Sequence, residues 1–151
     1  MVKIRDESTH MNDLVANITD GIKDSNENAS NISATMQELS ASMEEVAATK
    51  IKASGEAYGV RDPKSDVHIL DNIKTNKPKK TGNGGYADVT FSGSRPNGSG
   101  TVRNAEVAFI QEYGKKNQQA RPFVGEGMNK NADAIAKAGA EVILEWTEHN
   151  F

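Results

Sequence analysis

The chain has 151 residues, enough for one domain of ordinary size with a modest core. Its net charge of −3 excludes a strong whole-molecule attraction to nucleic acid or to anionic membranes. Cysteine is absent, which excludes disulfides, thiolate catalysis and cysteine-based metal sites. Aromatic residues make up only 5% of the chain and hydrophobic residues 36%. This thin apolar content predicts an elongated protein or a subunit that completes its burial against neighbours.

Residues 10–54 are predicted to form one long amphipathic helix, weakened midway by Gly21 and the polar segment Ser25–Asn28. Small and apolar residues recur there in alternating steps of four and three, which places them on one stripe of the helix. A stripe this narrow suits a coiled-coil seam or a helix laid along a sheet. Its members are Met11, Val15, Ile18, Ile22, Ser25, Ala29, Ile32, Met36, Leu39, Met43 and Val46.

Within residues 11–49, the segment Asn31–Thr49 (NISATMQELSASMEEVAAT) resembles the helical cytoplasmic region of methyl-accepting chemotaxis proteins. Glu38 and Glu45 each end a Gln-Glu or Glu-Glu pair, as the methylated glutamates of that family do. The resemblance implies a coiled-coil signalling fragment methylated at these two residues. The alternative is that both are exposed acidic residues on an amphipathic helix. A receptor would also need a long antiparallel hairpin with a kinase-binding tip, which the following sequence does not suggest.

A short helix is predicted over residues 62–72. Gly55, Gly59 and the Asp62-Pro63 pair end the long helix, and Asp62 suits an N-cap with Pro63 at the first helical position. The inward face of this helix comprises Val67, Leu70 and Ile73.

Residues 73–112 are predicted to form a small, mainly antiparallel sheet with long loops. Asn83-Gly84 indicates a hairpin turn, because both central positions of a type I′ turn need a positive φ. Pro78 cannot donate a ladder hydrogen bond, so it marks an edge or an interruption of the first strand. In the return strand, apolar residues alternate with the residues between them, which predicts an inward face formed by Ala87, Val89 and Phe91.

The next two segments are predicted from composition. Ser92–Gly100 is rich in glycine and serine and predicts a flexible loop. Asn104–Ile110 predicts a third strand or a short buried segment, which Tyr113-Gly114 ends.

The last predicted element is a helix over residues 125–148, on which Gly139 marks a close approach to another backbone. Its stripe again follows the four-three spacing: Met128, Ala132, Ile135, Gly139, Val142 and Trp146. The predicted fold class is α+β, with the long N-terminal helix and the C-terminal helix packed on the sheet in a single domain, residues 1–151.

From about residue 55 onward, and most clearly from Ile73, the chain resembles the tailed-phage head–tail connector proteins, also called neck, head–tail joining or tail-completion proteins. The matching motifs are RNAEVAFIQEYG (Arg103–Gly114), the basic loop after it, and ARPFV (Ala120–Val124) before an alanine-rich helix. The hairpin IKTNKPKKTGNGGYADVTF fits the same pattern. The helix ahead of residue 55 departs from the family in sequence.

This resemblance implies a structural subunit of a homo-oligomeric ring, six-fold or twelve-fold, in the virion neck, assembled in the host cytoplasm. Its partners would be head-closure or adaptor proteins and tail-tube or tail-terminator proteins. We expect the subunit interface at the ends of the most family-specific stretch, although Phe123 has a core role as its alternative. The residues concerned are Arg103, Tyr113, Lys115, Lys116, Arg121 and Phe123.

The hairpin is expected to carry Lys77, Lys79 and Lys80 toward a lumen through which DNA passes. Lysines there would touch phosphates transiently without reading bases. The alternative is a solvated run of charge.

No catalytic pattern is present, so we expect a protein that is not an enzyme and binds no cofactor or metal. The three histidines, His10, His68 and His149, are dispersed, and no Walker, Rossmann or nucleophile-elbow motif occurs. The apolar runs are far shorter than the roughly 20 residues of a membrane span, which predicts no membrane association.

Overall fold

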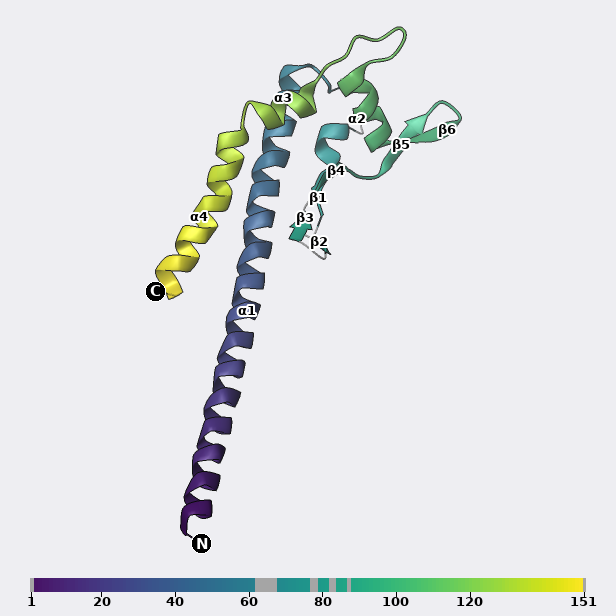
Figure 1. Cartoon of the computed structure of the whole chain (residues 1–151). Helices are drawn as coiled ribbons and strands as arrows, with labels where there is room; N and C mark the ends of the chain where they lie inside the picture. Colours follow the sequence, from purple (N-terminus) through teal and green to yellow (C-terminus); the bar gives the residue numbers. More distant parts are fainter. Residues whose placement is uncertain (1, 62–67, 77–78, 82–83, 87, 151) are drawn as a thin grey trace. The chain divides into compact units, whose positions relative to one another are not determined.

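The structure is a computed structural model that describes residues 2–61, 68–76, 79–81, 84–86 and 88–150 (Figure 1). The predicted α+β class is confirmed, because a long N-terminal helix and a C-terminal helix accompany short antiparallel strands. The elements in chain order are α1 (Val2–Ala57), the 3-10 helix η1 (Ile69–Asn72), β1 (Ile73–Thr75), β2 (Lys79–Thr81), β3 (Gly84–Tyr86), β4 (Val89–Phe91), β5 (Ser94–Asn97), β6 (Gly100–Arg103), α2 (Asn104–Tyr113), α3 (Phe123–Asn129) and α4 (Ala132–Asn150).

The chain divides into two compact units, Met1–Met36 and Gln37–Phe151, where the sequence predicts a single domain. In the described chain, the buried apolar residues all lie in the second unit. The first unit is the N-terminal part of α1, which continues without interruption through Gly21–Asn28. Its large apolar stripe residues are 53–62% exposed: Met11, Val15, Ile18, Ile22, Ile32 and Met36.

The core of the second unit surrounds Phe123, whose side chain is 0% exposed. Phe91 of β4 meets it edge to face, with ring centroids 5.8 Å apart. The cluster joins α1, η1, α2 and α3, and it consists of Ile51, Val60, Ile69, Leu70, Val107, Ala108 and Phe123. Of the short helix predicted over 62–72, residues Ile69–Asn72 form the 3-10 helix η1, in which Leu70 is buried as predicted. Residues 62–67, including Val67, lie outside the described residues.

α1 ends in a Schellman motif that brings the chain back toward the core. Gly59 has φ +63°, a left-handed conformation that favours glycine. The Val60 N–H donates to the Gly55 carbonyl at 2.9 Å, and the Gly59 N–H donates to the Glu56 carbonyl at 3.0 Å. Val60, which follows the turn, is buried in the core cluster.

The predicted first hairpin is present as two antiparallel ladders, β1 with β4 and β2 with β3. β2 and β3 pair in a register that places Thr81 opposite Gly84. Asn83 of the predicted turn lies outside the described residues. Pro78 and Ala87 also lie outside them, and β1 ends at Thr75 before β2 begins at Lys79.

The prediction of a flexible loop over Ser92–Gly100 was wrong, because β5 and β6 form a second hairpin there. Gly98 and Ser99 make its two-residue turn, and φ is positive at Gly98 (+60°) but not at Ser99. This is the type II′ arrangement, whose twist matches that of the paired strands.

Of the two alternatives predicted over Asn104–Ile110, a third strand or a short buried segment, the strand is wrong, since this segment is part of helix α2. Asn104, Val107 and Ala108 are its buried residues, at the i, i+3, i+4 spacing of one helical face. The Asn104 side chain donates to the Ser92 carbonyl at 2.6 Å and so joins the start of α2 to the base of the hairpin. Gly114 ends α2 with φ +76°, as the predicted Tyr113-Gly114 stop requires.

The C-terminal helix predicted over 125–148 is two helices, α3 and α4, separated at Lys130–Asn131. The Asn131 side chain donates to the Gly127 carbonyl at 2.9 Å. The Asn131 backbone carbonyl accepts from the N–H of Ile135 in the first turn of α4. Among the described helices, none combines the length and the apolar character needed to cross a membrane.

The close approach predicted at Gly139 is made to a side chain, and the approach to a backbone occurs at Gly127. A Cβ on Gly139 would lie 2.8 Å from Met43 Sδ on α1. A Cβ on Gly127 would lie 2.9 Å from the Ile51 Cα. The α3 backbone therefore rests directly on α1.

We expect Gly127→Ala to lower the free energy of unfolding by about 1–3 kcal/mol, the usual cost of overpacking. The new methyl group would meet the Ile51 backbone, which cannot move aside without displacing α1. Gly139→Ala is the matched control, because its methyl would meet the flexible end of Met43 and should cost less than about 1 kcal/mol. Urea denaturation measures both changes. Equal costs for the two variants would contradict this packing.

Candidate functional site

The predicted interface residues lie along the segment from the end of β6 to the start of α3. Phe123 is fully buried in the core, which is the alternative role that the sequence left open for it. Its ring is therefore not presented to a partner. The other five are exposed: Arg103, Tyr113, Lys115, Lys116 and Arg121. Their role in a subunit interface stays a prediction.

Arg121 also holds the loop before α3 in place. Its backbone N–H donates to the Gln111 carbonyl at 2.6 Å, and its Nη1 donates to the Gly59 carbonyl at 2.8 Å. Lys115 and Gln118 exchange backbone hydrogen bonds of 3.0 and 2.9 Å, which close the basic loop. The loop and the ARPF segment are thus fixed to α2 and to the end of α1.

The lysines predicted to face a lumen are seen only in part. Lys79 and Lys80 belong to β2, where they pair with Tyr86 and Gly85. Lys77 and all three side chains lie outside the described residues. Their contact with DNA remains a prediction.

Glu38 and Glu45, the residues that resemble methylation sites, are both exposed on α1. Glu44, between them in sequence, is only 6% exposed. The same helix therefore presents two carboxylates to solvent and buries a third.

α2 carries two aromatic side chains whose rings meet at a tilt of 48°, Phe109 and Tyr113, here called the aromatic pair. They stand one turn apart at i and i+4, with ring centroids 4.7 Å apart. Phe109 is 63% exposed and Tyr113 is 68% exposed. Tyr113 was predicted from the sequence as an interface residue, but Phe109 was not. The segment was predicted to be a strand or a short buried segment, and residues at i and i+4 become neighbours only on a helix.

Glu112 fixes α2 to the start of α3. Its carboxylate accepts hydrogen bonds from the Val124 N–H at 2.8 Å and the Gly125 N–H at 2.9 Å. These are unpaired donors in the first turn of α3, where a negative charge is also favoured. The aromatic pair is therefore mounted on a helix that the core and this cap both hold.

On another part of the second unit lies an open apolar pocket of about 420 Å³, here called the Glu44 pocket. α1, β4, α3 and α4 all contribute to it. Its lining comprises Ser40, Met43, Glu44, Ala47, Ile51, Val89, Val124, Met128 and Ile135.

Glu44 is the ionisable group of this lining. Its Oε1 atom is buried and has no hydrogen-bond partner within the described part of the chain. Burial, and after it the nearby Asp88 carboxylate, raise the pKa of Glu44 above its ordinary value of 4.5. A buried carboxyl oxygen without a donor costs free energy.

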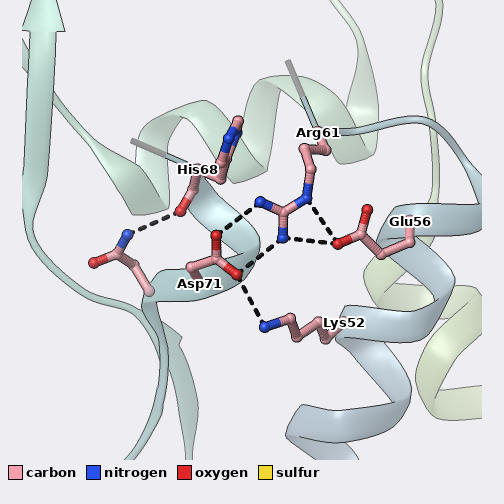
Figure 2. A network of polar contacts seen from close by, with 6 residues as sticks. Lys52, Glu56, Arg61, His68 and Asp71 are labelled. Atoms are coloured by element: carbon pink, nitrogen blue, oxygen red, sulfur yellow. Dashed lines mark hydrogen bonds and ion pairs between the residues drawn. The ribbon is translucent and has the colours of Figure 1, made fainter. Parts of the chain in front are cut away.

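Figure 2 shows a polar network between the end of α1 and η1. The Asp71 carboxylate accepts from Arg61 Nη1 at 2.8 Å, from Arg61 Nη2 at 2.9 Å and from Lys52 Nζ at 2.9 Å. Arg61 Nε also donates to Glu56 at 2.9 Å. The network is partly exposed and joins the end of α1 to η1.

Among the described residues, no group of three or more histidines or carboxylates lies close enough to hold a metal ion. Comparison with known protein families, with curated proteins and with solved structures finds no match for this chain. The candidate site therefore rests on two features, the aromatic pair and the Glu44 pocket.

We expect Asp71→Asn to lower the melting temperature at pH 7, because Arg61 and Lys52 lose their carboxylate. The hydrogen bonds from Arg61, and next those from Lys52, hold the pKa of Asp71 well below its ordinary value of 3.8. A carboxyl whose pKa is lower in the folded state stabilises the fold above the unfolded pKa and loses that effect as the pH falls.

The melting-temperature difference between wild type and Asp71→Asn should thus stay constant from pH 7 to about pH 5 and shrink below about pH 4. Asp20→Asn, which removes an exposed charge from α1, is the control and should show little difference throughout. A difference that persists unchanged in acid would contradict the role of the Asp71 carboxylate. Calorimetry across the pH range measures it.

We expect Glu112→Ala to lower the free energy of unfolding by about 0.5–2 kcal/mol, the range for losing a helix N-cap. Both N–H groups at the start of α3 lose their acceptor. Glu106→Ala is the control, since Glu106 is exposed on the same helix. Equal costs in urea denaturation would show that the cap contributes nothing.

Proposed function

We propose that the chain is a structural subunit of an oligomeric ring at the head–tail neck of a tailed phage or phage-like particle, where it joins head-closure components to the tail. In this role the protein catalyses nothing and needs no cofactor. Its work is to present matching surfaces to copies of itself and to its neighbours.

The observation that carries the proposal is the exposed aromatic pair on a firmly held helix. Exposed aromatic residues on a rigid element are typical of association surfaces, where they supply much of the binding free energy. α4 adds Ile143 and Leu144, which are 49% and 61% exposed. Together these side chains support a subunit whose burial is completed by other chains.

The placement at a phage neck rests on the resemblance of Arg103–Gly114 and Ala120–Val124 to connector proteins. These two motifs fold into α2 and the start of α3, and Glu112 joins them. The most family-like part of the sequence is thus also the part that presents the aromatic pair. This coincidence supports the proposal over a general assembly role.

A second candidate is a chemoreceptor-like signalling fragment, which the exposure of Glu38 and Glu45 favours. Against it, the resembling segment is not free along its length. Ala47 is buried, and the Ser42 hydroxyl donates to the Ala138 carbonyl of α4 at 3.3 Å. Incubation with the receptor methyltransferase and a labelled methyl donor tests it, and the absence of methylation at both residues would exclude this candidate.

We expect the purified chain to form closed oligomers in native mass spectrometry and to co-purify with portal, head-closure or tail-tube proteins from particles. Phe109→Ser should lower both yields, because it removes half of the aromatic pair without touching the core. Glu148→Ser, an exposed change on α4, is the control and should leave them unchanged. Particles that assemble with complete necks but lack this chain would contradict the proposal.

A further inference from the structure

The first unit carries a seven-residue repeat along α1, here called the α1 seam. Its members recur in alternating steps of four and three, which places them at the a and d positions of a coiled-coil heptad. A strict seven-residue repeat imposes a left-handed supercoil, which a second helix can follow. The large apolar members are 53–62% exposed. The seam consists of Met11, Val15, Ile18, Ile22, Ser25, Ala29, Ile32 and Met36.

The composition of residues 11–36 calls for packing against another helix. Asparagine, aspartate, serine, threonine and glycine make up 14 of these 26 residues, and all five are weaker helix formers than alanine or leucine. Helices in proteins owe most of their stability to the packing of an apolar face. No residue in 11–36 is buried in the single copy. Cover for this face must therefore come from a second chain.

The charges of this segment lie away from the seam. The e and g positions, which flank the seam, hold only uncharged residues, among them Leu14, which is 53% exposed. Two such faces meet without like-charge repulsion, so the seam is electrostatically compatible with a copy of itself. The charged residues of 11–36 all occupy b, c or f positions on the opposite side of the helix: Asp13, Asp20, Lys23, Asp24 and Glu27.

Hydroxyl groups on and beside the seam are already hydrogen-bonded within α1. Ser25 stands at a d position, with Thr19 and Thr35 on the flanks. Each hydroxyl donates to the backbone carbonyl four residues earlier, at 2.8–3.0 Å. Covering these three side chains with another helix therefore leaves none of their donors unsatisfied.

The sizes of the seam residues favour a second copy that runs in the opposite direction. In the antiparallel register that pairs all eight members, Ile22 faces Ser25 and Ile18 faces Ala29, so each small residue meets a large one. In a parallel pair Ser25 would face Ser25 and Ala29 would face Ala29, which leaves two successive layers poorly filled. Close packing favours the arrangement in which large and small residues face each other.

The area of this contact matches that of a stable dimer. Residues 11–36 form 26 residues of continuous helix. Such a helix is about 39 Å long and about 12 Å across, and its a, d, e and g positions make up just over half of its surface, roughly 800 Å² per copy. A standard stable interface buries about 800 Å² on each partner.

We propose that two copies of the chain pair through the α1 seam as an antiparallel coiled coil, with Val15 of one copy against Ile32 of the other. The same patch serves on both copies, so the contact is isologous and closes as a two-fold dimer. It uses neither residue of the aromatic pair. The inference therefore goes beyond the proposed ring function and does not rest on it.

Cysteine cross-linking tests the contact directly, because the natural chain contains no cysteine. Two full-length variants, Val15→Cys and Ile32→Cys, are mixed and mildly oxidised. Asp13→Cys mixed with Ala34→Cys is the matched control. These two positions face the same level of the proposed pair, but both are f positions on the outer side of the helix.

The expected result is a mixed 15–32 disulfide at several times the yield of the control pair, with little 15–15 or 32–32 product. A disulfide needs its two Cα atoms within about 7 Å, whereas the two Val15 residues of an antiparallel pair would be about 25 Å apart. Dominant 15–15 and 32–32 products would show a parallel pair and overturn the inference. A 15–32 yield no higher than the control, or no cross-link at all, would overturn it as well.

A second measurement examines the seam by charge. Ile22→Asp should weaken dimer formation at least tenfold in sedimentation equilibrium, because the contact would bury an unpaired carboxylate. Asn17→Asp is the control: it adds the same charge at a c position, outside the seam, and should leave the dissociation constant unchanged. Both are made in the Phe109→Ser chain, so that association through the aromatic pair does not obscure the result. Equal dissociation constants for the two variants would overturn the seam as the contact.

Discussion

The structure depends on the burial of Phe123 between the last turns of α1 and the elements that follow. A Cβ on Gly55 would lie 2.5 Å from Leu70 and 3.1 Å from Phe123, so a larger residue there would separate α1 from both. Gly127 repeats this constraint from α3, against the Ile51 backbone. Two glycines thus let three helical elements meet closely around one aromatic ring, and the remaining contacts of the second unit are arranged about that point.

A small core of this kind leaves much apolar surface outside it. The cluster around Phe123 uses the inward faces of α1, η1, α2 and α3, while the opposite face of α2 holds Phe109 and Tyr113. Since Glu112 and Asn104 fix both ends of α2, the aromatic pair is held in position before any partner arrives. Such preorganisation lowers the entropic cost of association.

The sequence was informative wherever a local rule decides the structure. The four-three stripe predicted α1, and alternation around Val89 predicted β4. The stop at Tyr113-Gly114 was placed correctly, although the segment that it ends was predicted to be a strand or a short buried segment. It failed where tertiary contacts decide. Asn104–Ile110 contains valine, phenylalanine and isoleucine, which favour strands, but the buried positions Asn104, Val107 and Ala108 follow a helical period. The Glu44 pocket could not be predicted at all, because α1, β4, α3 and α4 bring its residues together from distant parts of the sequence.

The central claim is that a single copy leaves surfaces which a second copy covers. Hydrogen–deuterium exchange measured over a range of protein concentrations tests it most directly, since it reports protection residue by residue. The account predicts that protection rises with concentration in α2, which carries the aromatic pair, while amides beside Phe123 do not change. Exchange that is independent of concentration throughout the second unit would contradict it.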